Sequence, residues 1–384
     1  MQPETGAIAR GRPASILIVG GGIGGLALSI GLGRAGLSCD LVEIKQEWAV
    51  YGVGLIQPGN ALRAYRALGL LEACLDRGFL YDRQRHYDAD GTLMHEAELP
   101  HIDGLDIVGT CGIGRPALHE ILKSEALSLG ARVRLGVSVE SLRQDPDGVD
   151  VAFTDGTTGR YDVVVGADGV RSRVRELAFG PDTNLHYTGQ GCWRFTTSRP
   201  AEMTWSSAHY GPNKAGLIPL SERTMYIYML SAEPENPWFR HEDLPALMRD
   251  RLHGYRGLIA EIAADIQSPD DVVYRPLEVL LMPLPWHRGR VVLIGDAAHA
   301  TTPHNAQGAA MAVEDAVVLT ELLRCGGPVE ALLQSFGERR FARCKLVVEA
   351  SEQIGIWQLK PTSTSQQEAI GLHTRVREML AKPL

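Results

Sequence analysis

The sequence predicts an α/β fold in which a parallel sheet flanked by helices is interrupted by a second, mostly β, domain. A short apolar stretch at residues 16–19 runs into a glycine-rich turn and a helical pattern, as at the opening of a βαβ unit. From about residue 181 the sequence becomes β-rich, with tryptophan, tyrosine and histidine and no sustained helical period. A buried-strand pattern returns at Arg290, so the chain is expected to re-enter the first domain and to end in helices.

Length and composition set the class of protein. The chain has 384 residues, 45% hydrophobic and 22% charged, which is enough for two packed domains. Its formal net charge of -8 gives no basic surface for nucleic acid, so we expect a small-molecule partner. The six cysteines form no C-x-x-C pair and no metal-ligand spacing, which predicts reduced thiols in a cytoplasmic protein without a metal. No apolar run reaches the roughly 18 residues needed to span a membrane.

These patterns divide the chain into four segments. Residues 1–14, which are polar and hold two prolines, predict a flexible leader. The other segments are the first part of a Rossmann-like domain (15–180), an inserted β-sheet domain (181–280), and the rest of the first domain with C-terminal helices (281–384). Local patterns predict a hairpin at 81–99, helices at 244–252, 258–266 and 309–323, and a strand at 272–280.

The glycine-rich turn has the spacing of a dinucleotide-binding fingerprint. Gly20 permits the tight turn, Gly22 lets backbone approach a pyrophosphate, and Gly25 allows close packing of helix on strand. Gly24 belongs to the same turn, and the phosphates would lie at the positive end of the helix. Glu43, at the end of the second strand, is placed to accept hydrogen bonds from an adenosine ribose. An acid at this position suits FAD or NAD and opposes NADP.

Two later segments have the same strand-to-turn character: Val165-Gly166-Ala167-Asp168-Gly169-Val170-Arg171-Ser172 and Val291-Val292-Leu293-Ile294-Gly295-Asp296-Ala297-Ala298-His299. In order and spacing, the three segments resemble those of the single-component (group A) flavoprotein monooxygenases, the FAD-dependent aromatic-ring hydroxylase family. The resemblance implies a p-hydroxybenzoate hydroxylase-like fold, with a GR2-type Rossmann FAD-binding domain and an inserted β-sheet substrate domain. Pro303-His304 is most similar to the salicylate and hydroxynicotinate hydroxylase branch.

The resemblance also implies cofactor contacts, each with a plainer alternative. Asp296 is implied to hydrogen-bond the ribityl chain of FAD, although Gly-Asp before a helix is also an ordinary cap. Asp168 is implied to contact FAD, with Arg171 and Arg175 contacting NADH or NADPH, although these residues also fit a β-turn before a basic helix start. Arg115 is implied to contact FAD from a helix start, and the alternative is a surface salt bridge.

The small-residue loop after the third segment is expected to face the flavin. Backbone N–H groups near Gly308 and Ala309 would stabilise negative charge at the flavin N1 and C2 carbonyl. Many relatives have a glycine pair and an asparagine here, whereas this chain has Asn305-Ala306 and Ala310. The sequence therefore leaves the contacts of this loop open.

The second domain offers candidates without a clear catalytic residue. Side chains suited to assist deprotonation of an aromatic substrate are His209, Tyr226 and His304. Side chains suited to contact the substrate are Trp193, Arg194, Tyr210, Tyr228 and Pro303. Each of these also fits a structural role within or beside a sheet.

The activity implied by the resemblance is hydroxylation of a small aromatic or heteroaromatic substrate by dioxygen and NADH or NADPH, through a flavin C4a-hydroperoxide. A first alternative is an epoxidase or reductase of an isoprenoid or lipid-like substrate, which an apolar tunnel without charged groups would favour. A second is a flavin-binding partner protein without turnover. Flavin-dependent halogenation is opposed because the chain has no Trp-x-Trp-x-Ile-Pro segment. A homodimer is expected by analogy alone.

Overall fold

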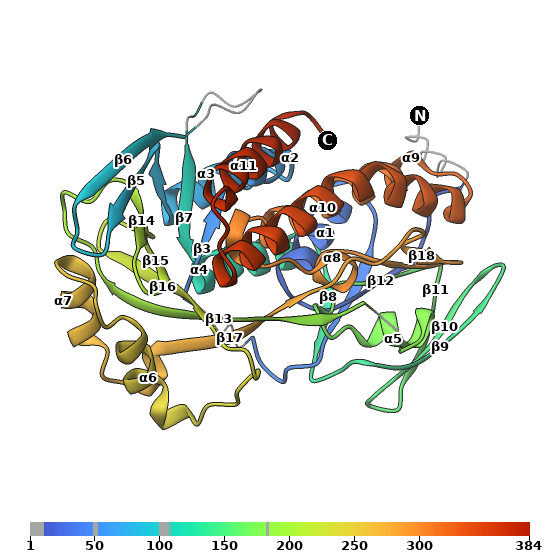
Figure 1. Cartoon of the computed structure of the whole chain (residues 1–384). Helices are drawn as coiled ribbons and strands as arrows, with labels where there is room; N and C mark the ends of the chain where they lie inside the picture. Colours follow the sequence, from blue (N-terminus) through green and yellow to red (C-terminus); the bar gives the residue numbers. More distant parts are fainter. Residues whose placement is uncertain (1–10, 49–52, 100–106, 108, 182–183) are drawn as a thin grey trace.

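The computed structural model describes residues 11–48, 53–99, 107, 109–181 and 184–384. The predicted α/β class is confirmed, since one domain is built on a parallel sheet and the other on a mainly antiparallel sheet (Figure 1). Part of the predicted leader, residues 1–10, lies outside the described residues. Residues 11–14 are attached to the domain, because Gly327 N donates to Gly11 O at 3.0 Å and Ala14 N donates to Asp162 Oδ2 at 2.6 Å.

The first domain is organised around the predicted βαβ unit. Strand β1 (Ile16–Val19) is buried along its whole length and pairs in parallel with β2 (Cys39–Glu43), to which it is joined by helix α1 (Ile23–Arg34). The other strands of this sheet are β8 (Arg132–Leu135), β12 (Val163–Gly166), β18 (His287–Arg288) and β19 (Val291–Leu293). Their order is β18-β19-β12-β1-β2-β8, with only β18 antiparallel. The return of the chain to this sheet after residue 290 is therefore confirmed.

Helices and two small sheets surround this parallel sheet. Helix α1 packs against α9 (Gly308–Cys325) and α4 (Arg115–Ser128), and α10 (Val329–Leu359) packs against α9 and α11 (Ser365–Ala381). The shorter helices are α2 (Gly59–Ala67), α3 (Leu71–Arg77), α5 (Arg173–Phe179), α8 (Asp296–His299) and η3 (Pro303–Asn305). The small sheets contain β3 (Gly54–Gln57), β4 (Phe79–Tyr81) and β7 (Thr110–Gly114), and β9 (Val139–Asp145), β10 (Gly148–Phe153) and β11 (Thr158–Tyr161).

The second domain is a seven-stranded sheet covered on one face by helices. Its strands are β5 (Arg83–Asp88), β6 (Leu93–Glu98), β13 (His186–Ser198), β14 (Ser206–Tyr210), β15 (Lys214–Pro219), β16 (Thr224–Ala232) and β17 (Val272–Val279), in the order β17-β13-β16-β15-β14-β5-β6. The covering helices are α6 (Leu244–Arg251) and α7 (Leu258–Asp265), accompanied by η1 (His241–Asp243) and η2 (Pro269–Asp271). The predicted helices and the strand from residue 272 are confirmed.

The hairpin β5–β6 belongs to the second sheet although it precedes residue 181. Strand β5 pairs in parallel with β14, from Gln84 opposite Ser206 to Asp88 opposite Tyr210. The hairpin itself turns at Asp90-Gly91 as predicted, with Gly91 at φ 86°. The predicted division at residue 181 therefore does not separate the two sheets, because pairing between distant strands is not encoded in local sequence.

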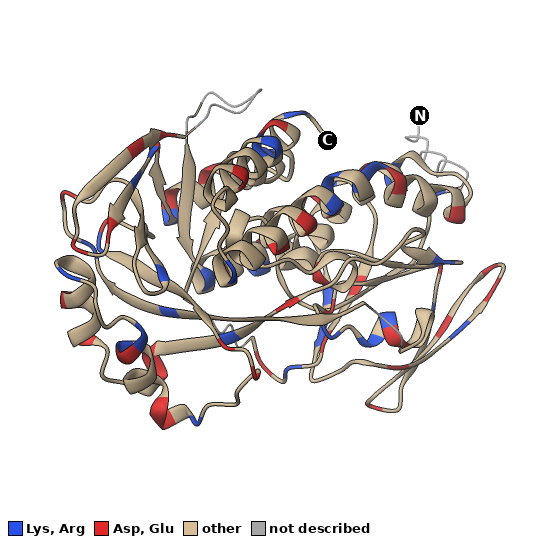
Figure 2. Cartoon of the chain, in the orientation of Figure 1, with Lys and Arg blue, Asp and Glu red and all other residues tan. Residues whose placement is uncertain are grey.

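Basic and acidic residues are interspersed along the ribbon of both domains (Figure 2). This mixture matches the moderate formal net charge of -8. Among the helices of the described residues, none is long and apolar enough to cross a membrane.

The close packing at the glycine turn generates a stability prediction. A Cβ atom at Gly25 would lie 2.0 Å from the backbone oxygen of Gly20, so Gly25→Ala forces β1 and α1 apart. We expect it to lower the free energy of unfolding by about 2–4 kcal/mol in urea denaturation. The control Gly371→Ala, on an exposed helical position with no atom within 4 Å of the added Cβ, should slightly stabilise the protein. Equal stabilities for the two variants would contradict the tight turn.

Candidate active site

The glycine turn leaves one open approach to the backbone, at Gly22. Gly20 has φ 109° and a Cβ there would lie 2.4 Å from the oxygen of Ala167, while a Cβ added at Gly24 would lie 3.3 Å from the Cβ of Ala312. A Cβ at Gly22, the N-cap of α1, would meet no atom within 4 Å. The turn therefore offers an unobstructed helix N-terminus, which fits a pyrophosphate.

Glu43 is held beside this turn by the backbone. Its Oε2 accepts a hydrogen bond from Gly21 N at 2.8 Å, and its Oε1 accepts one from Lys45 N at 3.1 Å. On the other side of the turn, the Nε2 of His119 lies 3.2 Å from Gly21 O. Glu43 thus stands at the mouth of the turn as the fingerprint requires, and its contact with a ribose stays a prediction.

Asp296 and Arg115 of the first domain lie close enough to interact through their charges, and Arg115 also lies near Arg194 and Arg275 of the second sheet; the region lined by these four residues is called the groove. Asp296 begins α8, is reached by solvent, and takes part in no hydrogen bond with any described residue. Burial of the carboxylate among surrounding atoms raises its pKa, and nearby Arg115 opposes that rise. Burial also lowers the pKa of Arg115, with Arg194 and Arg275 lowering it further. A carboxylate without a hydrogen-bond partner among the described residues, beside an arginine that has two further arginines near it, fits a cofactor that has both hydroxyl and phosphate groups.

Asp168 is placed as the cap of a helix. Its carboxylate accepts hydrogen bonds from Ser172 Oγ at 2.5 Å and from the backbone nitrogens of Arg173 and Val174 at 2.7 and 3.1 Å. The burial of Asp168 raises its pKa. These contacts match the β-turn and helix-start alternative at this residue, so a direct contact with FAD stays a prediction.

The two arginines predicted to meet the nicotinamide cofactor differ in access. Arg175 is buried, and its terminal nitrogens donate to the backbone oxygens of Ala297 and Val170 at 3.0 and 2.7 Å. Arg171 is 74% exposed and donates to Glu278 Oε1 at 3.0 Å. Arg175 therefore connects α8 to the 168–172 turn, whereas the side chain of Arg171 is exposed and accessible to a second ligand.

The start of α9 presents unpaired backbone donors. The nitrogens of Gly308, Ala309 and Ala310 donate to no acceptor within the described ranges. Immediately before them, His304 is fixed at both ring nitrogens, by Thr302 Oγ1 at 2.7 Å and Gln358 Oε1 at 3.0 Å. Burial lowers the pKa of His304 to about 3, so the ring is neutral. His304 is thus better placed to shape the loop than to exchange a proton.

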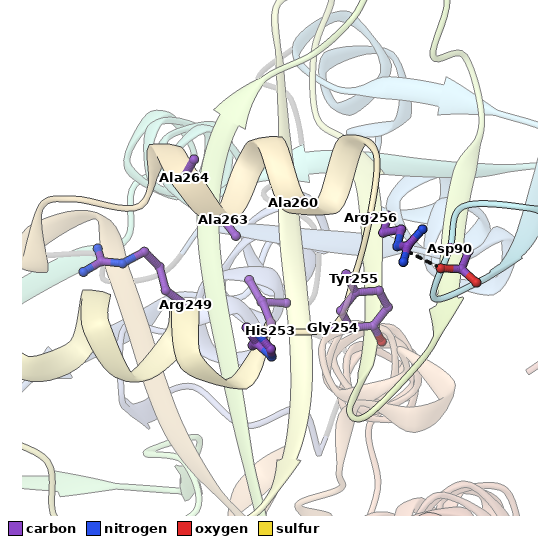
Figure 3. A pocket seen from close by; sticks show the side chains of 10 residues that line it. Asp90, Arg249, His253, Gly254, Tyr255, Arg256, Ala260, Ala263 and Ala264 are labelled. Carbon is purple, nitrogen blue, oxygen red and sulfur yellow. Dashed lines mark ion pairs between the residues drawn. The ribbon is translucent and has the colours of Figure 1, made fainter.

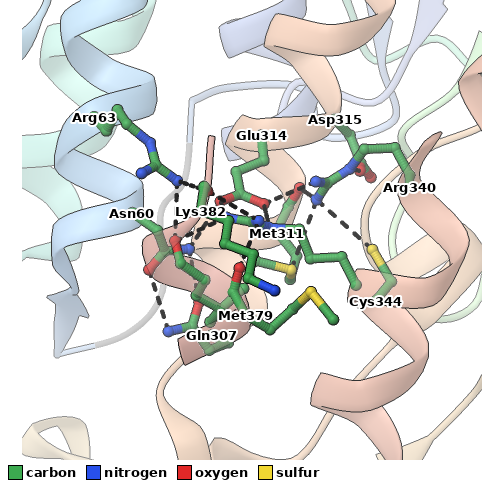
Figure 4. Close-up of polar contacts among 12 residues, drawn as sticks. Asn60, Arg63, Gln307, Met311, Glu314, Asp315, Arg340, Cys344, Met379 and Lys382 are labelled. Carbon is green, nitrogen blue, oxygen red and sulfur yellow. Dashed lines mark hydrogen bonds and ion pairs between the residues drawn. The ribbon is translucent and has the colours of Figure 1, made fainter. Parts of the chain in front are cut away.

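A buried acid anchors the turn that carries Asp296 (Figure 4). Asp315 accepts hydrogen bonds from Gly295 N at 2.8 Å, His299 Nε2 at 2.6 Å and Arg340 Nε at 2.7 Å. Burial disfavours charge on His299, but Cys344 and Asp315 outweigh it and raise the pKa of His299. The imidazolium and the carboxylate therefore form a charged pair directly behind the groove.

Glu314, the neighbouring buried acid, ties α9 to α2 and α10. It accepts hydrogen bonds from Arg340 at 2.8 Å, from Arg343 at 2.9 Å and from Asn60 Nδ2 at 3.0 Å. Asn60 also donates to Gln307 Oε1 at 3.0 Å, one residue before α9 begins. The network in Figure 4 thus fixes both ends of the 295–308 segment.

His299, Asp315 and Cys344 also lie within metal-ligand distance of one another. Asp315 already accepts three hydrogen bonds, and the guanidinium of Arg340 lies 3.7 Å from Cys344 Sγ. A metal cation would face that positive charge, so these contacts favour the ionic network over a metal site.

The face of the second sheet toward the first domain carries most of the substrate candidates. Tyr226 packs with Ile218 and Leu220 opposite β3, and Arg194 lies across from Tyr228 on the neighbouring strand. Neither Tyr226 nor Tyr228 has a hydroxyl hydrogen bond to a described residue. Tyr210 contributes through a 3.0 Å contact between its hydroxyl and His86 Nδ1.

Trp193 and His209 lie on the opposite face, which is a correction to their expected role. Trp193 is fully buried against α6 and α7, and its Nε1 donates to Ser231 Oγ at 2.9 Å. His209 is 7% exposed, stacks on Tyr87 and contacts Ser207 Oγ at 2.9 Å. Burial lowers the pKa of His209 to about 4. Strand alternation turns both side chains into the helix-covered core.

Sequence reasoning missed several groove residues, because each is unremarkable in its local sequence. Lys214 and Arg275 project from β15 and β17, and neither has an ion-pair partner among the residues the structure describes. Lys214 lowers the pKa of His86, His304 and His373, so all four side chains lie near one another. The available signal was the alternation of β15, which places Lys214 on the face shared with Ile218.

A separate hollow of about 500 Å³ lies at α6 and α7, lined by Asp90, Arg249, His253, Tyr255 and Arg256 among others (Figure 3). It shares no residue with the groove described above, and the Arg256–Asp90 ion pair crosses part of its rim. The hollow lies away from the three sequence segments, so the candidate active site remains the region where Asp296 and Arg115 of the first domain lie near Arg194 and Arg275 of the second sheet.

The exposure of Asp296 generates a binding prediction. Asp296→Ala removes the carboxylate whose charge favours the charged form of Arg115. We therefore expect the dissociation constant for FAD to rise at least about tenfold, or about 1.4 kcal/mol. Fluorescence titration of flavin-free protein measures it. The control Asp250→Ala, at an exposed position of α6, should bind FAD normally. Unchanged affinity in the Asp296 variant would refute the cofactor assignment.

The buried network predicts a contrast between two adjacent arginines. Arg340→Met leaves Glu314 and Asp315 with too little positive charge, so we expect the free energy of unfolding to fall by about 3–5 kcal/mol. Arg339→Ala breaks the partly exposed pair with Glu321 and should cost less than about 1 kcal/mol. Thermal or urea denaturation distinguishes them, and similar losses for both variants would contradict the special role of the network.

Comparison with known proteins gives a consistent result. Residues 13–351 match the protein family described as an FAD binding domain. The chain is 33% identical over 343 residues to the putative FAD-dependent monooxygenase YetM of Bacillus subtilis, covering 88% of this chain and 92% of that protein. It is 35% identical over 350 residues to 2-heptyl-3-hydroxy-4(1H)-quinolone synthase of Pseudomonas aeruginosa, covering 89% and 88%.

The fold comparison agrees. Klebsiella pneumoniae HpxO, in its complex with FAD and uric acid, superposes with a TM-score of 0.85 at 23% identity, covering 95% of each chain. This likeness shows the fold, and the FAD expected from the three sequence segments is supported by the match to the FAD-binding family. Together with the match over most of the sequence, these findings show that the chain belongs to the family of FAD-dependent monooxygenases.

Proposed function

We propose that this enzyme hydroxylates a small, acidic aromatic or heteroaromatic compound, with dioxygen and with NADH or NADPH as electron donor. The observation that carries the substrate class is Lys214, a half-buried cation on the groove face of the second sheet without a described counter-ion. Burial lowers its pKa, because the charged form of the amine is less favourable there than in water. A carboxylate or phenolate of the substrate would supply the missing charge.

The surroundings of Lys214 support this assignment. The nearby rings of His86, His304 and His373 all have lowered pKa values, so they are neutral at neutral pH and leave Lys214 without a charged partner among them. The hydroxyl of Tyr226, on the same face, is available to hydrogen-bond a polar ring substituent. A site that combines the cation of Lys214 with neutral hydrogen-bond donors and aromatic side chains suits a planar acid.

Bound FAD would supply the reactive oxygen, and this chain's residues would bind and orient the reactants. Asp296, Arg115 and the Gly22 turn would hold the cofactor, and the free N–H groups at the start of α9 would stabilise negative charge on it. The closely packed sheet face would exclude water from the substrate ring. Tyr228, beside Arg194, would assist a phenolic proton to leave.

Relatives give further support for a heteroaromatic substrate. One is named as a quinolone synthase, and HpxO was solved with uric acid. Arg171, exposed beside Glu278, is our candidate contact for the diphosphate of NADH or NADPH. A cytoplasmic location and a homodimer remain expectations of the same analogy.

The charges in the groove weigh against the alternative of an isoprenoid or lipid substrate. An apolar tunnel was the feature that would favour it, whereas Lys214, Arg194 and Arg275 face the space between the domains.

A flavin-binding partner without turnover would leave NAD(P)H oxidation unaffected by any small aromatic compound. Screening aromatic acids and pyridines for faster NAD(P)H consumption with matched hydroxylated product tests the proposal.

Lys214 yields a specificity prediction. In Lys214→Met the KM for an acidic ring substrate should rise about tenfold or more, because an anion loses its charged partner. Lys214→Arg should keep KM within about threefold, and the KM for the nicotinamide cofactor should change in neither variant. Steady-state NAD(P)H oxidation with acidic and neutral analogues measures this. An equal loss for neutral analogues would show that Lys214 does not select charge.

A further inference from the structure

Ala306, two residues before the start of α9 at Gly308, has a backbone conformation that L-residues rarely adopt. Its φ is 54° and its ψ is 34°, in the left-handed region. Among the described non-glycine residues, Asn236 alone shares a positive φ. Glycine takes this conformation freely, whereas a Cβ atom opposes it. The loop that leads to the free N–H groups of α9 is therefore strained at Ala306.

Two helices hold the residue before it. The Nδ2 of Asn305 donates to Ser351 Oγ of α10 at 2.9 Å. Its Oδ1 lies 2.8 Å from the Nδ1 of His373 on α11. Both ends of this amide are thus occupied, and its rotation is fixed. A strained residue persists only where its surroundings over-determine it, and Asn305 is where that constraint acts.

His373 has the properties of a fixed neutral donor. Burial lowers its pKa to about 4, with Lys214, Arg377 and His86 acting in the same direction. A neutral ring that bonds the carbonyl oxygen of an amide carries its proton on Nδ1. The helix that carries it is anchored as well, since Arg343 donates to the backbone oxygens of Met379, Leu380 and Lys382 at 2.9–3.2 Å.

We propose that His373 is a positioning residue which, through Asn305, keeps Ala306 left-handed and so sets where the N–H groups at the start of α9 point. The C-terminal helix α11 would thereby shape the flavin side of the site without touching the flavin. This inference needs FAD binding alone and is independent of the acidic substrate class.

His373 becomes dispensable when residue 306 adopts the left-handed conformation without support. Without the hydrogen bond from His373, Asn305 keeps only its contact with Ser351, so its amide is less constrained and Ala306 can relax toward negative φ and carry the start of α9 with it. A glycine at position 306 keeps the left-handed turn without steric cost. The effect of removing His373 should therefore depend on which residue occupies position 306.

A double-mutant cycle tests this dependence. The variants are His373→Ala, Ala306→Gly and the two combined, with His373→Gln as a replacement that keeps a donor. For each we would measure the FAD dissociation constant of the flavin-free protein, its thermal midpoint, and the reduction potential of the bound flavin. Arg375→Ala, at an exposed position on the same helix, is the control.

We expect His373→Ala to weaken FAD binding about five- to tenfold and to lower the flavin potential, with His373→Gln closer to the parent. Ala306→Gly should raise the thermal midpoint of the flavin-free protein by about 1–3 °C. In the combined variant FAD affinity should return to within about twofold of Ala306→Gly alone. Equal losses from His373→Ala with alanine or glycine at 306, or a matching loss in Arg375→Ala, would overturn the proposal.

Discussion

The buried pairing of Glu314 and Asp315 with Arg340 and Arg343 is the constraint on which the site depends. The two acids are consecutive on α9, so they point to different neighbours and join that helix to two segments at once. Asp315 bonds the backbone of Gly295 and so fixes the turn that exposes Asp296, while Glu314 reaches Asn60. A buried ionic cluster is costly to assemble and intolerant of a missing partner, which makes it better suited to fix geometry than to add stability.

With that turn fixed, the groove is assembled by two domains that contribute different chemistry. The first offers backbone N–H groups, the open Gly22 turn and the exposed carboxylate of Asp296. The second offers a β-sheet whose groove face bears tyrosines together with Lys214 and Arg194. In the proposed site, cofactor recognition would rest largely on backbone groups, which tolerate much change in sequence, whereas substrate recognition would rest on side chains that can be exchanged without disturbing the fold.

What the sequence predicted well was local. Local patterns of apolar spacing and turn residues mark the Gly20–Gly25 turn, helices α6 and α7, and the β5–β6 hairpin. What it missed depends on pairing between distant strands: the parallel contact of β5 with β14, and the gathering of Lys214 with His86 and His373. The sequence analysis named both Trp193 and Arg194 as substrate contacts, although adjacent residues of a strand face opposite sides, and the packing of α6 and α7 shows which side is covered.

Ala306 shows how local and distant constraints combine at one residue. Its sequence neighbours predict a small-residue loop, and nothing local indicates that an alanine would accept a left-handed turn. The conformation is possible because α10 and α11, more than forty residues further along the chain, supply Ser351 and His373 to hold Asn305. A glycine would achieve the same turn alone but would leave the loop free to sample others. Strain held by distant helices thus gives a more rigid loop than glycine would, in a place where the direction of a few N–H groups decides how negative charge is stabilised.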